Sequence, residues 1–224
     1  MSRDRLLKTG TLGLIAMAIV AAAWMAVGGP SARDLVPSLY QESYSLEARG
    51  DTSEALAKAR ELLGLSPRDY VAHLRVGWLS YLDGKYDDAI KHYRKAVSLR
   101  PNAVEPKLGL MLPLMGAHRH KEAIAVADEI LEKDPLNYLA SSRRAFSLYL
   151  TGKHERAERE YREILDLYPS DVEMMSGLGW SLLKQGRCPE AIRIFEELVR
   201  IAPRHVTGND GLAACEGAMR GREK

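Results

Sequence analysis

An uncharged apolar stretch lies near the start of the chain. Residues 9–29 read TGTLGLIAMAIVAAAWMAVGG, which is 21 positions without a charged side chain. At about 1.5 Å per residue, such a helix matches the roughly 30 Å hydrocarbon core of a membrane. We therefore predict a transmembrane signal anchor over residues 9–29, preceded by a cytoplasmic N-terminus at 1–8 and followed by a linker at 30–35.

The flanking charges predict the orientation of this segment. Three basic residues precede it and one follows it shortly afterwards: Arg3, Arg5, Lys8 and Arg33. Because the cytoplasmic flank carries the excess of Lys and Arg, we expect a single pass through the inner (plasma) membrane, with the rest of the chain periplasmic or otherwise extracytoplasmic. A cleaved signal peptide, cut after Ala21-x-Ala23, is the alternative.

The pattern changes after the linker, where small and apolar residues recur every 34 positions. A proline column consists of Pro67, Pro101, Pro135, Pro169 and Pro203. An alanine column lies twelve residues before it, at Ala55, Ala89, Ala123, Ala157 and Ala191. A third column consists of Gly50, Gly84, Gly152 and Gly186, with His118 in the remaining slot. These columns indicate five internal repeats, at 36–69, 70–103, 104–137, 138–171 and 172–205.

Each repeat is predicted to contain two helices. The glycine column provides the left-handed residue that ends the first helix, and the proline follows the second. The alanine column and the apolar residues four and seven positions after it predict a buried face on the second helix. That face comprises Ala59 and Leu62, Tyr93 and Ala96, Ala127 and Ile130, Tyr161 and Ile164, and Phe195 and Leu198.

Three local signals refine this picture. Asp51 and Glu54 have the spacing of a helix capping box, and Pro189 suits the first turn of a helix. Pro113 falls inside the first helix of the third repeat, where its ring would press on the carbonyl of Gly109. We expect a kink there, either as harmless drift in one repeat or as a bend that shapes a ligand site.

These columns, together with the aromatic positions Tyr93, Tyr161 and Phe195, resemble the tetratricopeptide repeat (TPR) family over residues 36–205. The resemblance implies an all-α TPR solenoid of five helix–turn–helix repeats, preceded here by one transmembrane helix. Residues 206–224 are then expected to form a capping helix and tail, because a solenoid end must be covered.

The family resemblance also implies a concave groove that is built from the first helices and binds a protein or peptide. Aromatic and apolar residues recur on that face, with a polar minority. The predicted ligand- or peptide-binding groove consists of Tyr40, Tyr44, Arg75, Trp78, Tyr81, Leu112, Met115, Arg143, Phe146, Tyr149 and Trp180. Alternatively, these aromatics fill gaps in the core and bind nothing. If they do form a ligand site, a glycan is the rival ligand, because aromatic faces also stack on sugar rings.

Composition narrows the possible functions. Thirty-two basic against 30 acidic residues leave a net charge of +2, which argues against nucleic-acid binding. No nucleophile–base pair, phosphate loop or paired carboxylates occur, so we predict no enzyme, no cofactor and no catalytic residue. We also predict no metal site at the turn histidines His118, His120 and His154. The pairing of Cys188 with Cys215 is left open; unpaired thiols are favoured.

We therefore predict a membrane-anchored TPR scaffold or adaptor in a cell-envelope assembly. Secretion, pilus, cytochrome-maturation and polysaccharide-export machineries are the types considered. The alternative is a glycan-binding TPR protein that serves exopolysaccharide or cell-wall synthesis. The sequence does not identify the partner, because a repeat fold indicates only the mode of binding.

Overall fold

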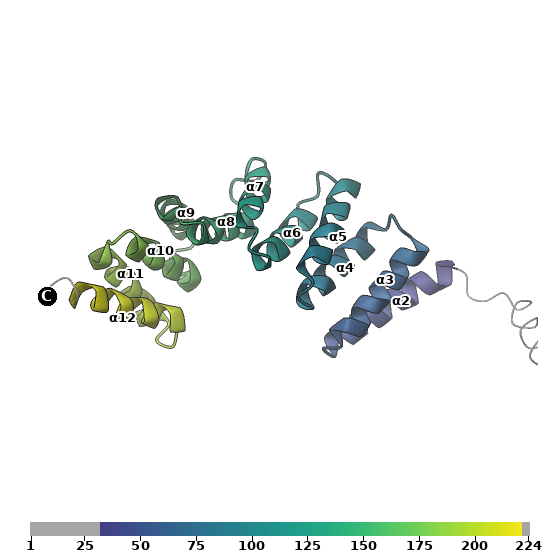
Figure 1. Ribbon diagram of the computed structural model, residues 1–224, viewed down its shortest axis with the longest axis horizontal. Coiled ribbons are helices and arrows are strands. Elements are labelled where there is room, and N and C mark those ends of the chain that lie inside the picture. Colours follow the sequence, from purple (N-terminus) through teal and green to yellow (C-terminus); the bar gives the residue numbers. More distant parts are fainter. Residues whose placement is uncertain (1–31, 221–224) are drawn as a thin grey trace, which may run out of the picture. The chain divides into compact units, whose positions relative to one another are not determined.

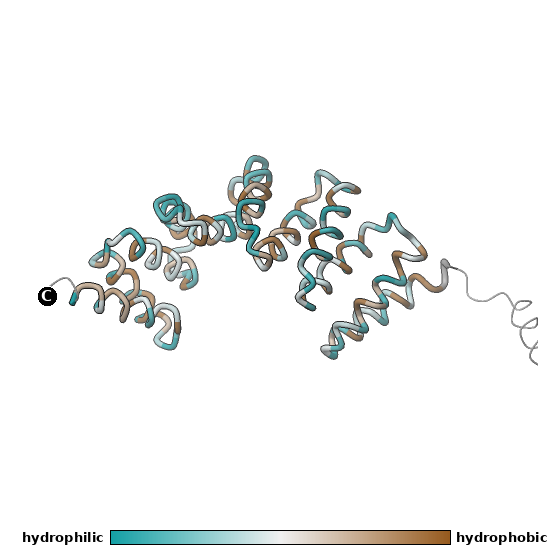
Figure 2. Tube along the Cα trace, in the orientation of Figure 1, coloured by the Kyte–Doolittle hydropathy of each residue, from teal (hydrophilic) through white to brown (hydrophobic). Residues whose placement is uncertain are grey.

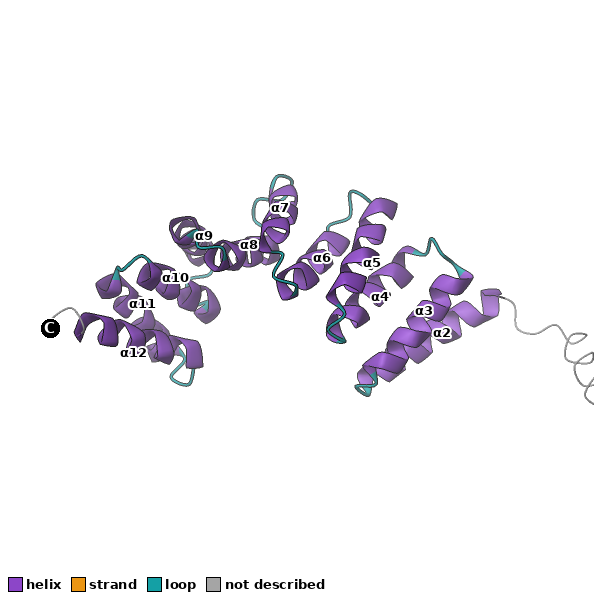
Figure 3. Cartoon of the chain, in the orientation of Figure 1, coloured by secondary structure: helices purple, strands orange, loops and turns teal. Residues whose placement is uncertain are grey.

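The computed structural model describes residues 32–220, and the predicted membrane segment at 9–29 lies outside them. In the described range the chain is all-α, with eleven helices and no strand (Figures 1 and 3). None of these helices is both long and apolar enough to cross a membrane. The all-α repeat architecture is confirmed, whereas the preceding transmembrane helix stays a prediction.

The described residues divide into two compact units, one ending at Pro67 and the other beginning at Arg68. The first contains α2 (Ala32–Ala48) and α3 (Thr52–Leu65), which pack against each other. Helix α2 begins at Ala32, within the segment 30–35 that the sequence predicts as a linker. The proline of this helix, Pro37, comes early enough to disturb only its second turn.

The second unit contains four further helix pairs and a final helix. Their bounds are α4 (Tyr70–Leu82), α5 (Tyr86–Leu99), α6 (Glu105–Gly116), α7 (His120–Leu131), α8 (Tyr138–Leu150), α9 (His154–Leu167), α10 (Val172–Lys184), α11 (Cys188–Ile201) and α12 (Val206–Arg220). Each helix packs on the next, and α4, α6, α8 and α10 also pack in series. Helix α12 packs on both α10 and α11, as the first helix of another repeat would (Figure 1).

The turns within the pairs follow the glycine column. Gly50, Gly84, Gly152 and Gly186 have φ angles of 86°, 71°, 76° and 77°, so the predicted left-handed residues are confirmed. His118, which occupies the fifth slot, adopts the same region with φ 58°. The repeat therefore imposes the left-handed turn even where no glycine is present.

The predicted capping box at Asp51 is wrong. Its side chain accepts no hydrogen bond from α3, and its ψ of 58° lies outside the extended region that N-capping residues adopt. Helices α4, α8 and α10 are capped instead by Asp69, Asn137 and Asp171, whose backbones are extended. Pro189 lies in the first turn of α11, as predicted.

The buried faces predicted from the alanine column are confirmed. All five alanines are fully buried, and the apolar residues four and seven positions later are at most 5% exposed. Figure 2 shows the hydropathy of each residue, and apolar and polar residues alternate along the helices. Pro113 is also buried, and α6 runs continuously from Glu105 to Gly116, so this proline does not end the helix.

Glycines on the first helices receive the large rings of the preceding second helices. A Cβ added at Gly109 would lie 2.3 Å from the Tyr93 ring, and one at Gly177 would lie 2.3 Å from Cζ of Tyr161. A Cβ at Gly211 of α12 would lie 2.2 Å from Cζ of Phe195. No side chain fits at such distances, so each aromatic ring packs directly on the next helix backbone.

This close approach predicts opposite effects for two glycine-to-alanine changes in the second unit. Gly177→Ala should lower the free energy of unfolding by about 1–3 kcal/mol, because the ring of Tyr161 must move. Gly217→Ala should raise it by about 0.5–1 kcal/mol, because no atom lies within 4 Å and Ala favours helix. Urea denaturation of both variants measures the difference, and changes of the same sign would contradict the packing.

Candidate functional site

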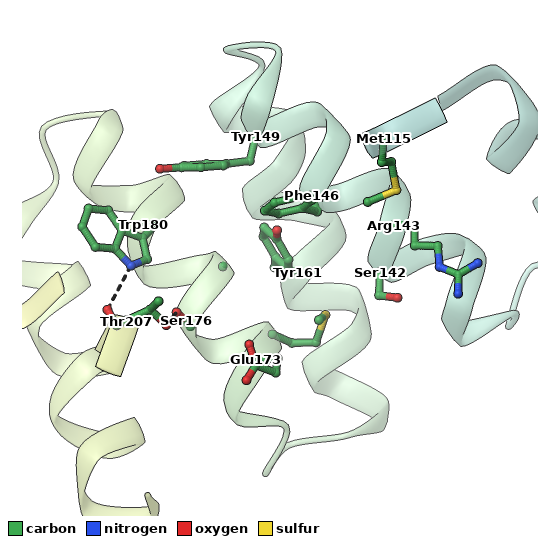
Figure 4. Close-up of a pocket in the computed structure, with 12 residues that line it drawn as sticks. Met115, Ser142, Arg143, Phe146, Tyr149, Tyr161, Glu173, Ser176, Trp180 and Thr207 are labelled. Atoms are coloured by element: carbon green, nitrogen blue, oxygen red, sulfur yellow. Dashed lines mark hydrogen bonds between the residues drawn. The ribbon is translucent and has the colours of Figure 1, made fainter. Parts of the chain in front are cut away.

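A pocket of about 480 Å³ lies on the second unit, between helices α6, α8, α9, α10 and α12 (Figure 4). Its walls are mostly apolar, with hydroxyl, carboxylate and guanidinium groups among them. The lining residues are Met115, Ser142, Arg143, Phe146, Tyr149, Tyr161, Glu173, Met174, Ser176, Gly177, Trp180 and Thr207. Such a concave apolar surface with a few polar groups has the general character of a ligand-binding site.

The pocket brings together five of the eleven residues predicted for the groove. These five are Met115, Arg143, Phe146, Tyr149 and Trp180. They come from the three consecutive first helices α6, α8 and α10. Stacking of successive repeats therefore turns a spacing of 34 residues into a local cluster.

The two most prominent rings of the pocket, those of Phe146 and Trp180, lie on opposite sides of it (Figure 4). Phe146 is 44% exposed, which is unusual for a phenylalanine. The indole of Trp180 lies edge-on to the buried Phe195 ring, with 6.0 Å between centroids, and donates from Nε1 to the Thr207 carbonyl at 3.1 Å. One wall is thus held in a fixed orientation, while the other is an exposed aromatic surface.

Tyr161 also lines the pocket, with its ring against Gly177 (Figure 4). It is 2% exposed, and its hydroxyl makes no hydrogen bond to any group in the described part of the chain. Burial raises the pKa of the Tyr161 hydroxyl, which is therefore a neutral donor at physiological pH. A hydroxyl without a protein partner at the pocket wall is available to a ligand atom.

Polar groups around the pocket are held by contacts within the second unit. Glu173 pairs with His205 at 3.2 Å, and the hydroxyls of Ser176 and Thr207 are 3.0 Å apart. Arg143 donates from Nη1 to the Leu108 carbonyl at 2.7 Å, and its guanidinium points away from Trp180 (Figure 4). Burial lowers the pKa of Arg143. This arginine therefore ties α8 to α6.

The other predicted groove residues do not line this pocket. Trp78 packs partly on the core around Tyr93 and Leu110, and its ring lies 5.7 Å from that of Tyr81. Leu112 is half-buried on α6, and Arg75 is only 5% exposed. Tyr40 and Tyr44 belong to the first unit, where Tyr44 is 52% exposed. The packing alternative therefore fits Trp78 better than it fits Phe146.

Sequence reasoning did not assign seven of the lining residues to the groove, including Tyr161, Gly177 and Thr207. The sequence predicts Tyr161 to be a core residue, because it lies four positions after Ala157, where every repeat has a packing position. The usable signal is Gly177, which shares a 34-residue column with Gly109 and Gly211. A glycine there leaves the preceding aromatic ring uncovered by a side chain.

The described residues offer little for metal chemistry. They contain no group of three or more His, Cys, Asp or Glu residues that could hold a metal ion. His118 and His120 lie close, with 5.9 Å between ring centroids, and burial together with the charge on His118 lowers the pKa of His120. The expectation that the protein has no enzymatic activity stays a prediction.

Helix pairs that stack in series, with a pocket on the layer of first helices, define a helical-repeat protein. A model described as tetratricopeptide repeat matches residues 40–104 and 147–206, and another of the same description matches 80–145. The chain therefore belongs to the tetratricopeptide repeat family.

Solved structures share this fold at low sequence identity. A tetratricopeptide repeat protein from Parabacteroides merdae superposes with a TM-score of 0.75 at 20% identity, covering 83% of this chain and 73% of that one. MamA from Desulfovibrio magneticus gives 0.72 at 18%, covering 79% and 99%. YrrB, described as a TPR protein with an unusual peptide-binding site, gives 0.65 at 16%, covering 77% and 89%.

One curated relative matches part of the sequence. It is the uncharacterized protein y4yS of Sinorhizobium fredii, which is 29% identical over 94 residues. The match covers 42% of this chain and 52% of the relative, so the chain spans about half the length of the relative that it matches.

Proposed function

We propose that this protein binds a protein partner by taking an apolar side chain of an extended segment into the pocket of the second unit. The observation that carries the proposal is the exposed Phe146 ring opposite Trp180, in a pocket that the Tyr161 hydroxyl also lines. Large aromatic side chains dominate binding energy at protein interfaces. Residues from three successive helices also suit an extended ligand that runs across the repeats.

The polar groups suggest how the ligand backbone is oriented. The Tyr161 hydroxyl can donate to a peptide carbonyl, whereas Glu173 can accept from a peptide N–H or face a basic side chain. The peptide-binding site in the description of YrrB supports a peptide ligand by analogy of fold. We infer that the preferred segment carries one aromatic or long aliphatic residue as its anchor.

We extend this proposal to the place where binding occurs. The uncharged stretch at 9–29 and the basic residues before it support an anchored chain that recruits its partner at the outer face of the inner membrane. A scaffold in an envelope assembly is consistent with a repeat domain on a single anchor. Protease treatment of inverted membrane vesicles should leave the repeat domain protected, and a mature N-terminus after Ala23 would contradict the anchor.

Binding of a randomised peptide library to the purified full-length chain tests the proposed function. Phe146→Ala should lower the affinity for the selected peptides about tenfold or more, because this exposed ring is covered only when a ligand binds. Leu150→Ala is the matched control, since Leu150 lies one turn further along α8, is similarly exposed at 46% and does not line the pocket. Equal losses in the two variants would contradict the proposed site.

The same pair of variants distinguishes the glycan alternative. A glycan-binding function would be supported if no peptide is selected and neutral oligosaccharides bind the wild-type chain. Their affinity should then fall in Phe146→Ala. Titration in rising salt adds a second criterion, because affinity for a charged peptide falls with ionic strength and affinity for a neutral sugar does not.

A further inference from the structure

The two cysteines of the chain meet in one buried cluster of the second unit. They lie 27 positions apart in sequence, with Cys188 at the first residue of α11 and Cys215 within α12. Cys188 is 2% exposed and Cys215 is fully buried. Both belong to the hydrophobic cluster that contains Ala191 and Phe195. Since the sequence holds two cysteines in total, each has the other as its only intramolecular thiol partner.

The packing of α12 on α11 explains why these cysteines meet. Added Cβ atoms at Gly208 and Gly211 would lie 2.5 Å from Leu198 and 2.2 Å from Phe195, respectively. The helices therefore run in opposite directions, with later residues of α12 facing earlier residues of α11. Cys215 lies one turn beyond Gly211, on the same face of α12, and is carried toward the N-terminal end of α11.

The ionisation of the Cys215 thiol is consistent with this proximity. Burial, together with the neighbouring side chain of Cys188, raises the pKa of the Cys215 thiol to about 11. The reduced Cys215 thiol is therefore neutral and slow to react while it is buried. Oxidation then requires that α12 opens transiently or that the bond forms during folding.

We propose that Cys188 and Cys215 form a disulfide in an oxidising environment and thereby fasten α12 to α11. The step is a thiol–disulfide exchange with a small-molecule or protein disulfide. Both sulfurs lose their protons and become joined, while the two electrons and two protons convert the S–S bond of the oxidant into two thiols. The bond matters beyond stability, because Thr207 of α12 lines the pocket and holds Trp180 through its carbonyl.

Equilibration of the purified full-length chain in glutathione buffers of graded redox ratio tests this proposal. In oxidising buffer we expect both thiols to disappear, no bound glutathione and no dimer on a non-reducing gel. The Tm of the second unit should rise by roughly 5–10 °C, because the bond restricts the unfolded chain. Amides of α12 should exchange with solvent at least roughly tenfold more slowly than in the reduced chain.

Two alanine variants provide the controls. The double variant Cys188→Ala with Cys215→Ala should fold and show the same Tm in both buffers. Cys188→Ala alone should show no redox-dependent Tm rise, because Cys215 then has no intramolecular partner. The proposal would be overturned by glutathione adducts in place of the bond, by a disulfide-linked dimer or by thiols that stay free at equilibrium. It would also be overturned if the amides of α12 exchanged at the same rate after oxidation.

Discussion

Replacing Phe195 by alanine should lower the free energy of unfolding of the second unit by about 3–5 kcal/mol. Its ring is fully buried and rests on the backbones of two helices, at Gly179 of α10 and Gly211 of α12. It also supports the indole of Trp180. The cavity left by the ring cannot be filled from these glycines, because neither carries a side chain that could move into it.

The other phenylalanine of the chain is the matched control. Phe146 is 44% exposed, so Phe146→Ala should cost well under 1 kcal/mol of stability. Urea denaturation of both variants, followed by circular dichroism, gives the comparison. Similar midpoints for the two variants would mean that the ring of Phe195 does not fix α10, α11 and α12 as described.

Replacing Trp180 by alanine should weaken binding of the selected peptide by about 2 kcal/mol, which is a roughly 30-fold loss of affinity. The indole forms one wall of the pocket and is held by its hydrogen bond to Thr207. Little side-chain entropy of the indole is therefore lost when a ligand binds. The stability loss should be smaller than that of Phe195→Ala, because Trp180 is only partly buried. Isothermal titration with one selected peptide measures the affinity.

Trp180→Phe and Trp78→Ala complete this test. Trp180→Phe keeps an aromatic wall but loses the hydrogen bond to Thr207, so we expect an intermediate affinity. Trp78 lies outside the pocket and packs on a different part of the core, so Trp78→Ala should affect stability more than affinity. An affinity loss at Trp78 equal to that at Trp180 would place the ligand elsewhere on the second unit.

The fold followed from sequence to a large extent, because repetition makes a weak signal strong. One alanine or one glycine predicts little, but five in register at Ala55 to Ala191 defined the buried face of each second helix. The left-handed turn predicted at the glycines extends to His118, where the sequence made no such prediction. The cap at Asp51 failed because residue spacing does not determine backbone angles, and here ψ is 58°.

The site was predicted less completely. Helical periodicity placed Phe146, Tyr149 and Trp180 on one face, and the structure brings these residues to one pocket. Helical periodicity could not show that Tyr161 reaches the same pocket from α9, because that contact depends on the absence of a side chain at Gly177. Contacts between different helices, such as the bond from Trp180 to Thr207, have no local pattern in sequence.

The matching of ring and glycine has a consequence for how the gene can change. Tyr93, Tyr161 and Phe195 are followed sixteen residues later by glycine, whereas Ala127 is followed at the same distance by Arg143. Loss of the single unit 104–137 by unequal recombination would place Arg143 where Gly109 now faces Tyr93. The ring of Tyr93 has no room beside such a side chain. Loss of 104–171 would bring Tyr93 to Gly177, which preserves the fit. Natural length variants of this array should therefore differ more readily by two adjacent repeats than by this one.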